Sequence, residues 1–247
     1  IMFEKNNLIS HEQKQITSNE NFNILVSEKD KSKKNILNNY SFPIGSVIGF
    51  AGLQGSYNDL FVKNFFSKEL SETKFENAED YFSKNIYYYM PADRLEKGLF
   101  SELNLLEHFA LSASSGSNFI NWNIIKKLAD KKIKEFNIKG NYNTRINELS
   151  GGNQQRLTLS LIPENQSILL LEQPTRGLDF SSAKNIWEMI LSRKNKDIAI
   201  LFSSTDIDEI WEYSDIIFSI SGRRIMDINY SKNLTKDMVK NYVSGIA

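Results

Sequence analysis

The sequence predicts an α/β fold built on a mainly parallel sheet, with a helical subdomain inserted into it. Strands of a parallel sheet are buried on both faces, so they appear in a sequence as unbroken apolar runs. Such runs alternate with helical stretches from residue 46 onward: Val47–Ala51, Ile86–Met90, Ile168–Leu171, Ile198–Phe202 and Asp215–Ile220. Residues 95–147 contain no comparable run and show helical periodicity instead, at Glu102–Leu111 and Trp122–Phe136.

The flanking regions differ from this core. Residues 1–45 are polar and charged, and only Phe22–Val26 resembles a strand there, so we expect a small antiparallel β region. The charged run Lys29–Lys34 is more typical of a hairpin turn or a solvated loop than of a binding patch. Ser231–Val243 predicts a closing helix. We expect a single domain, with a β region at 1–45, a core at 46–94 and 148–230, a helical subdomain at 95–147 and a C-terminal helix at 231–247.

Composition excludes several classes of function. The chain has 247 residues, of which 40% are hydrophobic and 24% charged, enough to bury one sizeable core. Its 30 basic residues balance 30 acidic ones, so no bulk field attracts nucleic acid or an anionic membrane. Without cysteine there are no disulfides, thiolate metal sites or cysteine nucleophiles. Because Ile1 precedes Met2, we expect a fragment of a longer polypeptide.

The run from Gly49 to Asp59 has the context of a phosphate-binding loop, since it follows a buried strand and precedes a helix. In the pattern G-x-x-x-x-G-K-[ST], glycines let backbone amides surround phosphate, the lysine neutralises charge and the hydroxyl binds Mg²⁺. Counted from Gly52, those last three positions are Tyr57, Asn58 and Asp59. We therefore expect a degenerate phosphate loop, composed of Gly52, Gly55, Ser56, Tyr57, Asn58 and Asp59. Two interpretations stay open: a turn that binds no nucleotide, or weak binding through the remaining amides.

A second motif, Leu149–Gln155, keeps what an anion-binding helix start needs. Ser150 offers a hydroxyl, Gly151 and Gly152 let backbone amides approach a ligand, and the helix dipole favours phosphate. The alternative is a turn that merely starts a helix. The segment Pro174–Asp179, at a fitting distance along the chain, argues against that alternative.

Together, Leu149–Gln155 and Ile168–Asp179 resemble the signature motif, Walker B strand and D-loop of ATP-binding cassette (ABC) transporter ATPases. The resemblance implies an ABC-type P-loop NTPase core. Where the family has Asp-Glu, this chain has Glu172-Gln173, so Glu172 is a weak candidate for Mg²⁺. Gln173 can orient a water molecule but cannot accept its proton.

Other family positions are changed as well. Thr205 stands at the position of the family's γ-phosphate histidine, and Ala92 at that of the Q-loop glutamine. His11 and His108 are too distant in sequence to substitute, and we expect ordinary surface or packing roles for them. The resemblance therefore implies that the nucleotide site formed by this domain's own phosphate loop does not hydrolyse ATP.

The resemblance also implies a division of labour. ABC domains pair head to tail, and the signature of one closes over the nucleotide held by the phosphate loop of the other. Residues expected to act in trans on a partner's ATP and Mg²⁺ are Ser150, Gly151, Gly152, Gln154 and Asp179.

Three segments narrow the resemblance to one group within the ABC family: Met90–Leu99, Asn153–Gln155 and Pro174–Gly177. Over about residues 35–225 the chain resembles the C-terminal cassette of the tandem subunits that drive monosaccharide or nucleoside import. This implies a second cassette in the same polypeptide, permease subunits, indirectly an extracytoplasmic substrate-binding protein, and the cytoplasmic face of a bacterial inner membrane. The alternatives are a nucleotide-free scaffold for dimerisation and docking, and a non-transport ABC ATPase acting on ribosomes or in DNA repair. The latter is disfavoured because basic patches with interleaved aromatics are absent, so no nucleic-acid partner is expected.

Overall fold

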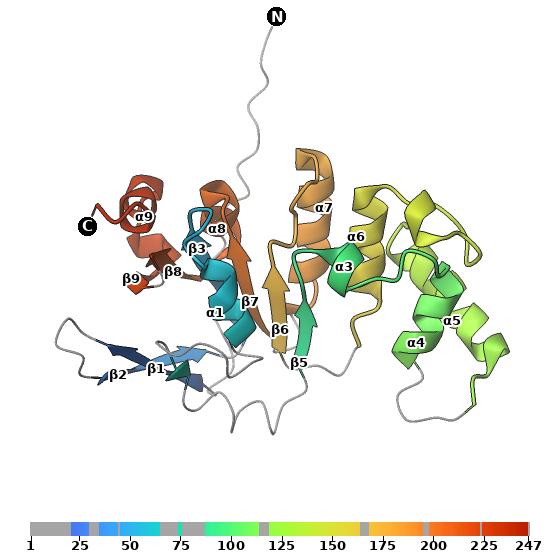
Figure 1. Ribbon diagram of the computed structural model, residues 1–247, viewed down its shortest axis with the longest axis horizontal. Helices are drawn as coiled ribbons and strands as arrows, with labels where there is room; N and C mark the ends of the chain where they lie inside the picture. Colours follow the sequence, from blue (N-terminus) through green and yellow to red (C-terminus); the bar gives the residue numbers. More distant parts are fainter. Residues whose placement is uncertain are drawn as a thin grey trace, which may run out of the picture.

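The core of the protein is a six-stranded sheet in the order β5-β6-β7-β3-β8-β9 (Figure 1). A computed structural model describes residues 21–29, 35–43, 45–64, 74–75, 87–113, 119–163, 168–194, 198–222 and 224–246. The core strands are β3 (Val47–Gly52), β5 (Tyr87–Met90), β6 (Ile168–Glu172), β7 (Ala199–Ser204), β8 (Ile216–Ser221) and β9 (Arg224–Tyr230). Neighbours pair in parallel except β8 and β9, which are antiparallel. The mainly parallel α/β sheet predicted from the sequence is confirmed. The edge strand β9 was not predicted, because its residues are exposed or half-buried and form no apolar run.

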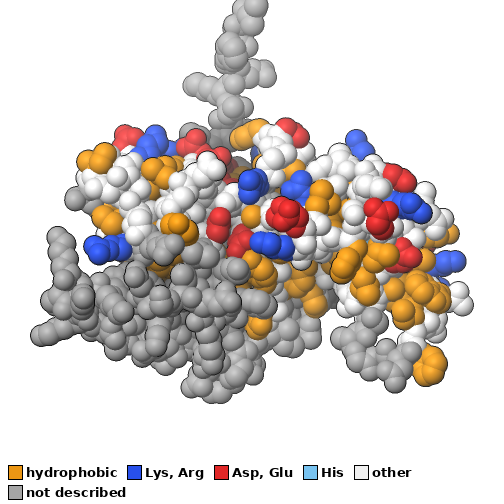
Figure 2. All heavy atoms as spheres, viewed as in Figure 1, with side chains coloured by type: hydrophobic (Ala, Val, Ile, Leu, Met, Phe, Trp, Pro, Cys, Tyr) orange, Lys and Arg blue, Asp and Glu red, His pale blue; other side chains and the backbone are white. Residues whose placement is uncertain are grey.

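A helical subdomain lies to one side of the sheet, where the sequence predicts it (Figure 1). It contains α4 (Leu105–Ala113), α5 (Trp122–Glu135) and the 3-10 turn η1 (Ile146–Glu148), and the short helix α3 (Arg94–Lys97) connects it to β5. The α5 helix begins at Trp122 because Asn121 caps it, accepting from the amides of residues 123 and 124. Hydrophobic side chains gather on the surface of this subdomain in Figure 2. His108 is buried, and its Nε2 accepts from the Phe100 backbone amide across 3.0 Å, which agrees with the packing role expected for it.

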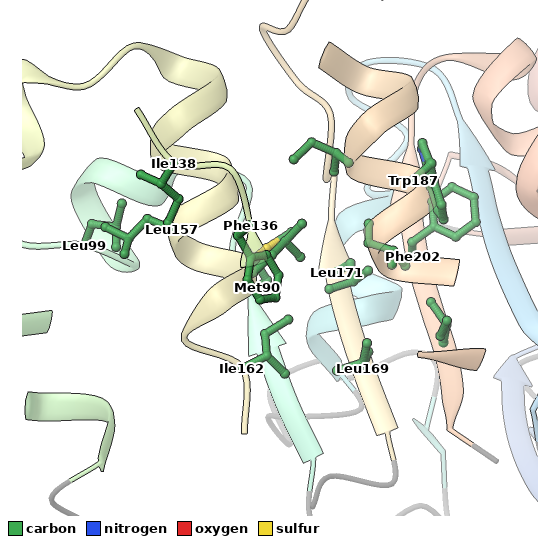
Figure 3. Close-up of a cluster of buried hydrophobic side chains, with 14 of the residues drawn as sticks. Met90, Leu99, Phe136, Ile138, Leu157, Ile162, Leu169, Leu171, Trp187 and Phe202 are labelled. Carbon is green, nitrogen blue, oxygen red and sulfur yellow. The ribbon is translucent and has the colours of Figure 1, made fainter. Parts of the chain in front are cut away.

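The central strands β3, β6, β7 and β8 are buried on both faces, and their alternate side chains enter two different hydrophobic clusters. On one face, Leu169, Leu171 and Phe202 belong to one hydrophobic cluster with buried residues of the helices α6 (Gly151–Ser160), α7 (Phe180–Leu191), α8 (Ile207–Tyr213) and α9 (Lys236–Val243). Figure 3 shows part of this cluster. Trp187 of α7 meets Phe202 edge-on, with ring centroids 4.6 Å apart. On the other face, strand residues such as Phe50 pack with Phe61 of α1 (Asn58–Asn64). This double burial explains the unbroken apolar runs.

The N-terminal β region is a separate antiparallel sheet in the order β2-β1-β4, formed by β1 (Asn21–Lys29), β2 (Asn35–Pro43) and β4 (Lys74–Phe75). The strand predicted at Phe22–Val26 lies within β1. The charged turn expected after Lys29 falls on residues 30–34, and His11 on the N-terminus; both lie outside the described residues.

The predicted C-terminal helix begins later than expected. Ser231–Asn233 forms the 3-10 turn η3, and α9 starts at Lys236 because Thr235 caps it, its Oγ1 accepting from the Met238 amide. Across the described ranges, no helix combines the length and apolarity that crossing a bilayer requires.

Candidate functional site

The candidate site lies where three neighbouring parallel strands end. In the order β6-β7-β3, the carboxyl ends of the strands lead into the loop after Glu172, the turn after Ser204 and the phosphate loop. Parallel strands bring their carboxyl ends to one edge of a sheet, where α/β proteins bind ligands. Segments more than 100 residues apart in sequence therefore meet here.

The phosphate loop is folded onto itself. The Ser56 amide donates to the Leu53 carbonyl across 2.9 Å. A Cβ added at Gly52 would lie 2.1 Å from the Ser56 Oγ, so this buried hydroxyl occupies the inside of the turn. Gly55 and Tyr57 both adopt positive φ, 87° and 65°. For Tyr57, at the former glycine position, this conformation costs on the order of 1–3 kcal/mol.

Asn58, at the lysine position, is buried at the carboxyl ends of the strands and is only 3% exposed. Its Nδ2 donates to the carbonyl of Phe50 across 3.1 Å and to that of Ser204 across 2.9 Å. The amide thus ties the start of α1 to β3 and β7. A residue that would neutralise phosphate is replaced by one that satisfies two backbone carbonyls.

Asp59, at the hydroxyl position, bonds to the residue that replaces the catalytic carboxylate. Its Oδ2 accepts from Gln173 Nε2 across 2.7 Å, and its Oδ1 accepts from Ser203 Oγ across 2.6 Å. Gln173 has a φ of 41°, and its backbone amide donates to the backbone carbonyl of Ser203 across 2.9 Å. Sequence reasoning brought Asp59 and Gln173 to one site but missed Ser203; the polar pair ending an apolar strand was the available signal.

Glu172, the weak Mg²⁺ candidate, is held by the chain itself. Its Oε1 accepts from the Tyr89 hydroxyl across 2.6 Å and its Oε2 from the Ala92 amide across 3.2 Å. Burial, and then the hydrogen bond to Glu172, raise the pKa of Tyr89, so that Tyr89 remains a donor. Within the described ranges, no three His, Cys, Asp or Glu side chains are grouped to hold a metal ion. With the oxygens of Asp59 and Glu172 both engaged and the hydroxyl residue lost, the residues present do not fit an Mg²⁺ ion.

Thr205, at the γ-phosphate position, is exposed just beyond β7. The preceding Ser204 donates its hydroxyl to Glu209, which also accepts from the Thr175 hydroxyl and from Trp187 Nε1 at 2.7 Å. Burial raises the pKa of Glu209, and these three hydrogen bonds oppose the rise. Sequence reasoning missed Glu209, because nothing along the chain shows that its donors converge.

The Ser150 hydroxyl accepts a hydrogen bond and donates to no acceptor within the part of the chain that the structure describes. Asn153 Oδ1 accepts from the Lys139 amide across 2.8 Å, which fixes the orientation of the Asn153 amide. Asn153 Nδ2 therefore donates to Ser150 Oγ, also across 2.8 Å. Ser150 is the N-cap residue of α6, but its side chain does not cap the helix. The first amides of a helix have no intrahelical acceptor, so hydroxyl and amides together suit an anion.

The two signature glycines have different surroundings. A Cβ at Gly151 would lie 2.8 Å from Arg94 Nη2, whereas a Cβ at Gly152 would meet nothing closer than Ser182 Oγ at 3.6 Å. Gln154, expected to act in trans, is buried: its Oε1 accepts from Arg94 Nε across 3.3 Å. Its Nε2 donates to the carbonyls of Ile146 and Leu149. In this structure the Gln154 side chain supports the signature from within.

Asp179, at the D-loop position, is the N-cap residue of α7. Its Oδ2 accepts from Ser182 Oγ across 2.7 Å and its Oδ1 from the Ser182 amide across 3.0 Å, and these bonds lower the pKa of Asp179. The next residue, Phe180, is 83% exposed. A carboxylate and an aromatic ring are thus presented together at the start of α7.

No protein-family model matches the chain. Sequence relatives are bacterial import proteins. The ribose import ATP-binding protein RbsA of Caldanaerobacter subterraneus subsp. tengcongensis is 30% identical over 218 residues, covering 81% of this chain and 44% of that protein. The xylose import ATP-binding protein XylG of Moorella thermoacetica is 28% identical, with 90% and 47% covered. The nucleoside import ATP-binding protein NupA of Lactococcus lactis subsp. cremoris is 28% identical, with 78% and 41% covered. The chain spans about half the length of these relatives.

Solved structures show the same fold. An ATP-binding subunit of an ABC transporter superposes with a TM-score of 0.64 at 16% identity, covering 90% of this chain and 99% of that one. The ATP-binding cassette MJ0796, as a dimer bound to ADP and phosphate, gives a TM-score of 0.64 at 17% identity, with 85% and 99% covered.

Proposed function

We propose, from the premise that this chain is an ABC ATPase, that it energises import of a sugar or a nucleoside by completing the ATP site of a partner cassette. Its relatives import ribose, xylose or nucleosides, which supports this class of cargo. The observation that carries the proposal is an asymmetry within one molecule. The side chains of Asn58 and Asp59 in the phosphate loop bond to other groups of the same chain, while the signature presents a hydroxyl proton and helix amides.

The own site is degenerate in this proposal. Asn58 and Asp59 direct their polar atoms at Phe50, Ser203, Ser204 and Gln173, all within the chain. A nucleotide would have to displace these bonds, and the Asp59 carboxylate would oppose phosphate charge. We infer that this site binds ATP weakly or not at all and does not hydrolyse it.

The trans-acting residues are Ser150, Gly151, Gly152 and Asp179, with Gln154 as internal support. The partner is a second cassette with an intact phosphate loop, which holds ATP and Mg²⁺. Because the matched relatives are about twice as long as this chain, we place that cassette in the same polypeptide, with this chain as its C-terminal half. In the assembled pair, the first amides of α6 and the Ser150 hydroxyl contact the γ-phosphate.

Permease subunits are the second class of partner, bound at the cytoplasmic face of the inner membrane. The helical subdomain exposes an apolar surface over α4 and α5 that suits a protein contact (Figure 2). Its members are Leu111, Phe119, Ile120, Trp122 and Ile124. A substrate-binding protein outside the membrane acts only indirectly, through the permease.

The second candidate function is a nucleotide-free scaffold, whose task is dimerisation and permease docking. The hydrogen bonds that Asn58, Asp59 and Gln173 form within the chain favour this scaffold function, because a site that binds no ligand has its polar side chains bonded to the protein itself. The two functions differ at the signature, which a scaffold does not need for chemistry.

The test is ATP turnover and uptake by the full-length tandem protein, reconstituted with its permease. Gly152→Asp places a carboxylate at the start of α6, at a position with room for a side chain. Like-charge repulsion against the partner's γ-phosphate should lower turnover by about a hundredfold. The matched control is Asn143→Asp, which adds the same charge at an exposed position outside α6. If turnover and uptake persist in Gly152→Asp, the trans function is excluded and the scaffold is favoured.

A further inference from the structure

The loop between β6 and α7, residues 173–179, is bonded to other elements at four successive residues. Gln173 bonds to Asp59 of α1, and the Pro174 carbonyl accepts from Gln155 of α6. Thr175 bonds to Glu209 of α8, and the Arg176 carbonyl accepts from Arg94 of α3 across 3.4 Å. This loop ends at Asp179, so its conformation determines where the D-loop carboxylate lies.

The Asp59–Gln173 bond differs from the other three, because it starts from the degenerate phosphate loop. In the intact pattern, the residue at position 59 offers a hydroxyl to Mg²⁺ and would contact this region through the bound nucleotide. Here a carboxylate reaches the same edge of the sheet and accepts directly from Gln173, with Ser203 as its second donor. Hydrogen bonds to an ionised acceptor are roughly twice as strong as neutral ones.

The backbone of Gln173 indicates that its position is imposed. Its φ of 41° lies in the left-handed region, which residues other than glycine rarely adopt. Such strain persists only where surrounding contacts over-determine it. Two hydrogen bonds hold Gln173 in this conformation. The Asp59 carboxylate accepts from its side chain, and the Ser203 carbonyl accepts from its backbone amide.

We propose that Asp59 and Gln173 form a positioning pair that holds the loop 173–179, and with it Asp179, in the form required at the partner's ATP site. A protein-to-protein hydrogen bond takes the place of a bound nucleotide, so the D-loop is in place whether or not this domain binds ATP. The loop also contacts the signature helix through Gln155 and Pro174, so the pair supports both trans-acting elements. This inference rests on the trans function proposed above.

The polarity of the bond provides the test. Gln173→Glu sets two carboxylates against each other. Asp59→Asn leaves a neutral amide–amide hydrogen bond, because the Gln173 amide can rotate to present its oxygen to the new Nδ2, and it removes only the charge of the acceptor. The double variant Asp59→Asn/Gln173→Glu exchanges donor and acceptor. In it, the amide nitrogen introduced at residue 59 donates to the carboxylate introduced at residue 173, and the amide oxygen still accepts from Ser203. Gln173→Ala, which removes the donor without adding charge, decides the matter if a single variant fails to assemble.

The measurement is ATP turnover by the full-length tandem protein with its permease, with melting temperatures recorded for each variant. Gln173→Glu and Gln173→Ala should each lower kcat about tenfold, as loss of one charge-assisted hydrogen bond would, and Asp59→Asn should lower it less. The KM for ATP should stay the same, because the partner's phosphate loop holds the nucleotide. The double variant should recover most of the kcat, which a role confined to stabilising α1 would not produce.

Three results would overturn the pair: unchanged kcat in Gln173→Glu and in Gln173→Ala, a change confined to KM, or no recovery in the double variant relative to Gln173→Glu. Gly152→Asp in the same preparation separates the two proposals. If Gly152→Asp abolishes turnover and the Asp59 and Gln173 variants do not change it, only the positioning pair is wrong. If Gly152→Asp is harmless, the trans function itself is wrong.

Discussion

The guanidinium of Arg94 lies against Gly151, so closely that a Cβ on that glycine would stand 2.8 Å from Arg94 Nη2. Arg94 also donates from Nε to Gln154 Oε1 across 3.3 Å and from Nη1 to the Arg176 carbonyl across 3.4 Å. One side chain from the subdomain connection thus joins the signature helix to the loop that ends at Asp179. The absence of a side chain at residue 151 makes room for this arginine.

A double-mutant cycle tests this dependence. Replacing a helical glycine by alanine stabilises a helix by up to about 1 kcal/mol. We expect Gly151→Ala to give this gain in the Arg94→Ala background and to lose most of it beside Arg94, because the methyl group displaces the guanidinium. Denaturant unfolding of the chain measures both values. Gly152→Ala is the matched control, since its Cβ has ordinary contacts, and equal gains for Gly151→Ala in the two backgrounds would contradict the contact.

The isolated domain should not hydrolyse ATP, and Gln173→Glu should not rescue it. A glutamate at residue 173 would lie against the Asp59 carboxylate, which now accepts from Gln173 Nε2 across 2.7 Å, and Asn58 would still offer no positive charge. Turnover is measured with purified domain and Mg²⁺. Rates on the order of 1–10 s⁻¹, ordinary for enzymes, would show that the own site works.

ATP should stabilise the isolated domain only slightly. The buried Ser56 hydroxyl occupies the inside of the phosphate loop, and the Asp59 carboxylate repels phosphate. A ligand present at or below its dissociation constant stabilises a fold by less than about 0.5 kcal/mol. Thermal unfolding at millimolar ATP should therefore show little change in Tm, and a clear increase at micromolar ATP would refute this account of the loop.

Glu209 should give the stability of the domain a definite pH dependence. Burial raises its pKa above the usual value of 4.5. The contribution of Glu209 is then fully present below about pH 4.5 and is lost as the pH rises through the raised pKa. Glu209→Gln cannot ionise, so its free energy of unfolding relative to the unmodified chain should improve as the pH rises above about 4.5 and through the raised pKa of Glu209.

The measurement for Glu209 is denaturant unfolding at several pH values. Glu212→Gln, which removes an exposed carboxylate from the same helix, is the matched control. In Glu209→Gln, the new Nε2 must donate to the Ser204 hydroxyl, which can reverse its role from donor to acceptor. A stability difference that stays constant with pH would contradict a raised pKa of Glu209 in the folded state.

The sequence by itself determined the class of fold and the location of the altered motif positions. Both are local properties: β3, β6, β7 and β8 are visible as apolar runs because each is buried on both faces. Tyr57, Asn58 and Asp59 stand at fixed spacing from Gly52. Helices α4 and α5 were likewise predicted to within a few residues, since periodicity and the cap at Asn121 are encoded locally.

Only the tertiary structure decided which polar groups meet. The strand order β6-β7-β3 brings Gln173 to Asp59 across 114 residues of sequence, and no local pattern specifies that order. The same is true of Glu209 with its three donors and of Arg94 above Gly151. The carboxylate at residue 59 could be identified along the chain as a loss of metal-binding chemistry. Its hydrogen bonds to Gln173 and Ser203 became visible only when the ends of the strands were brought together, because hydrogen bonds depend on distances of about 3 Å that spacing along a sequence does not determine.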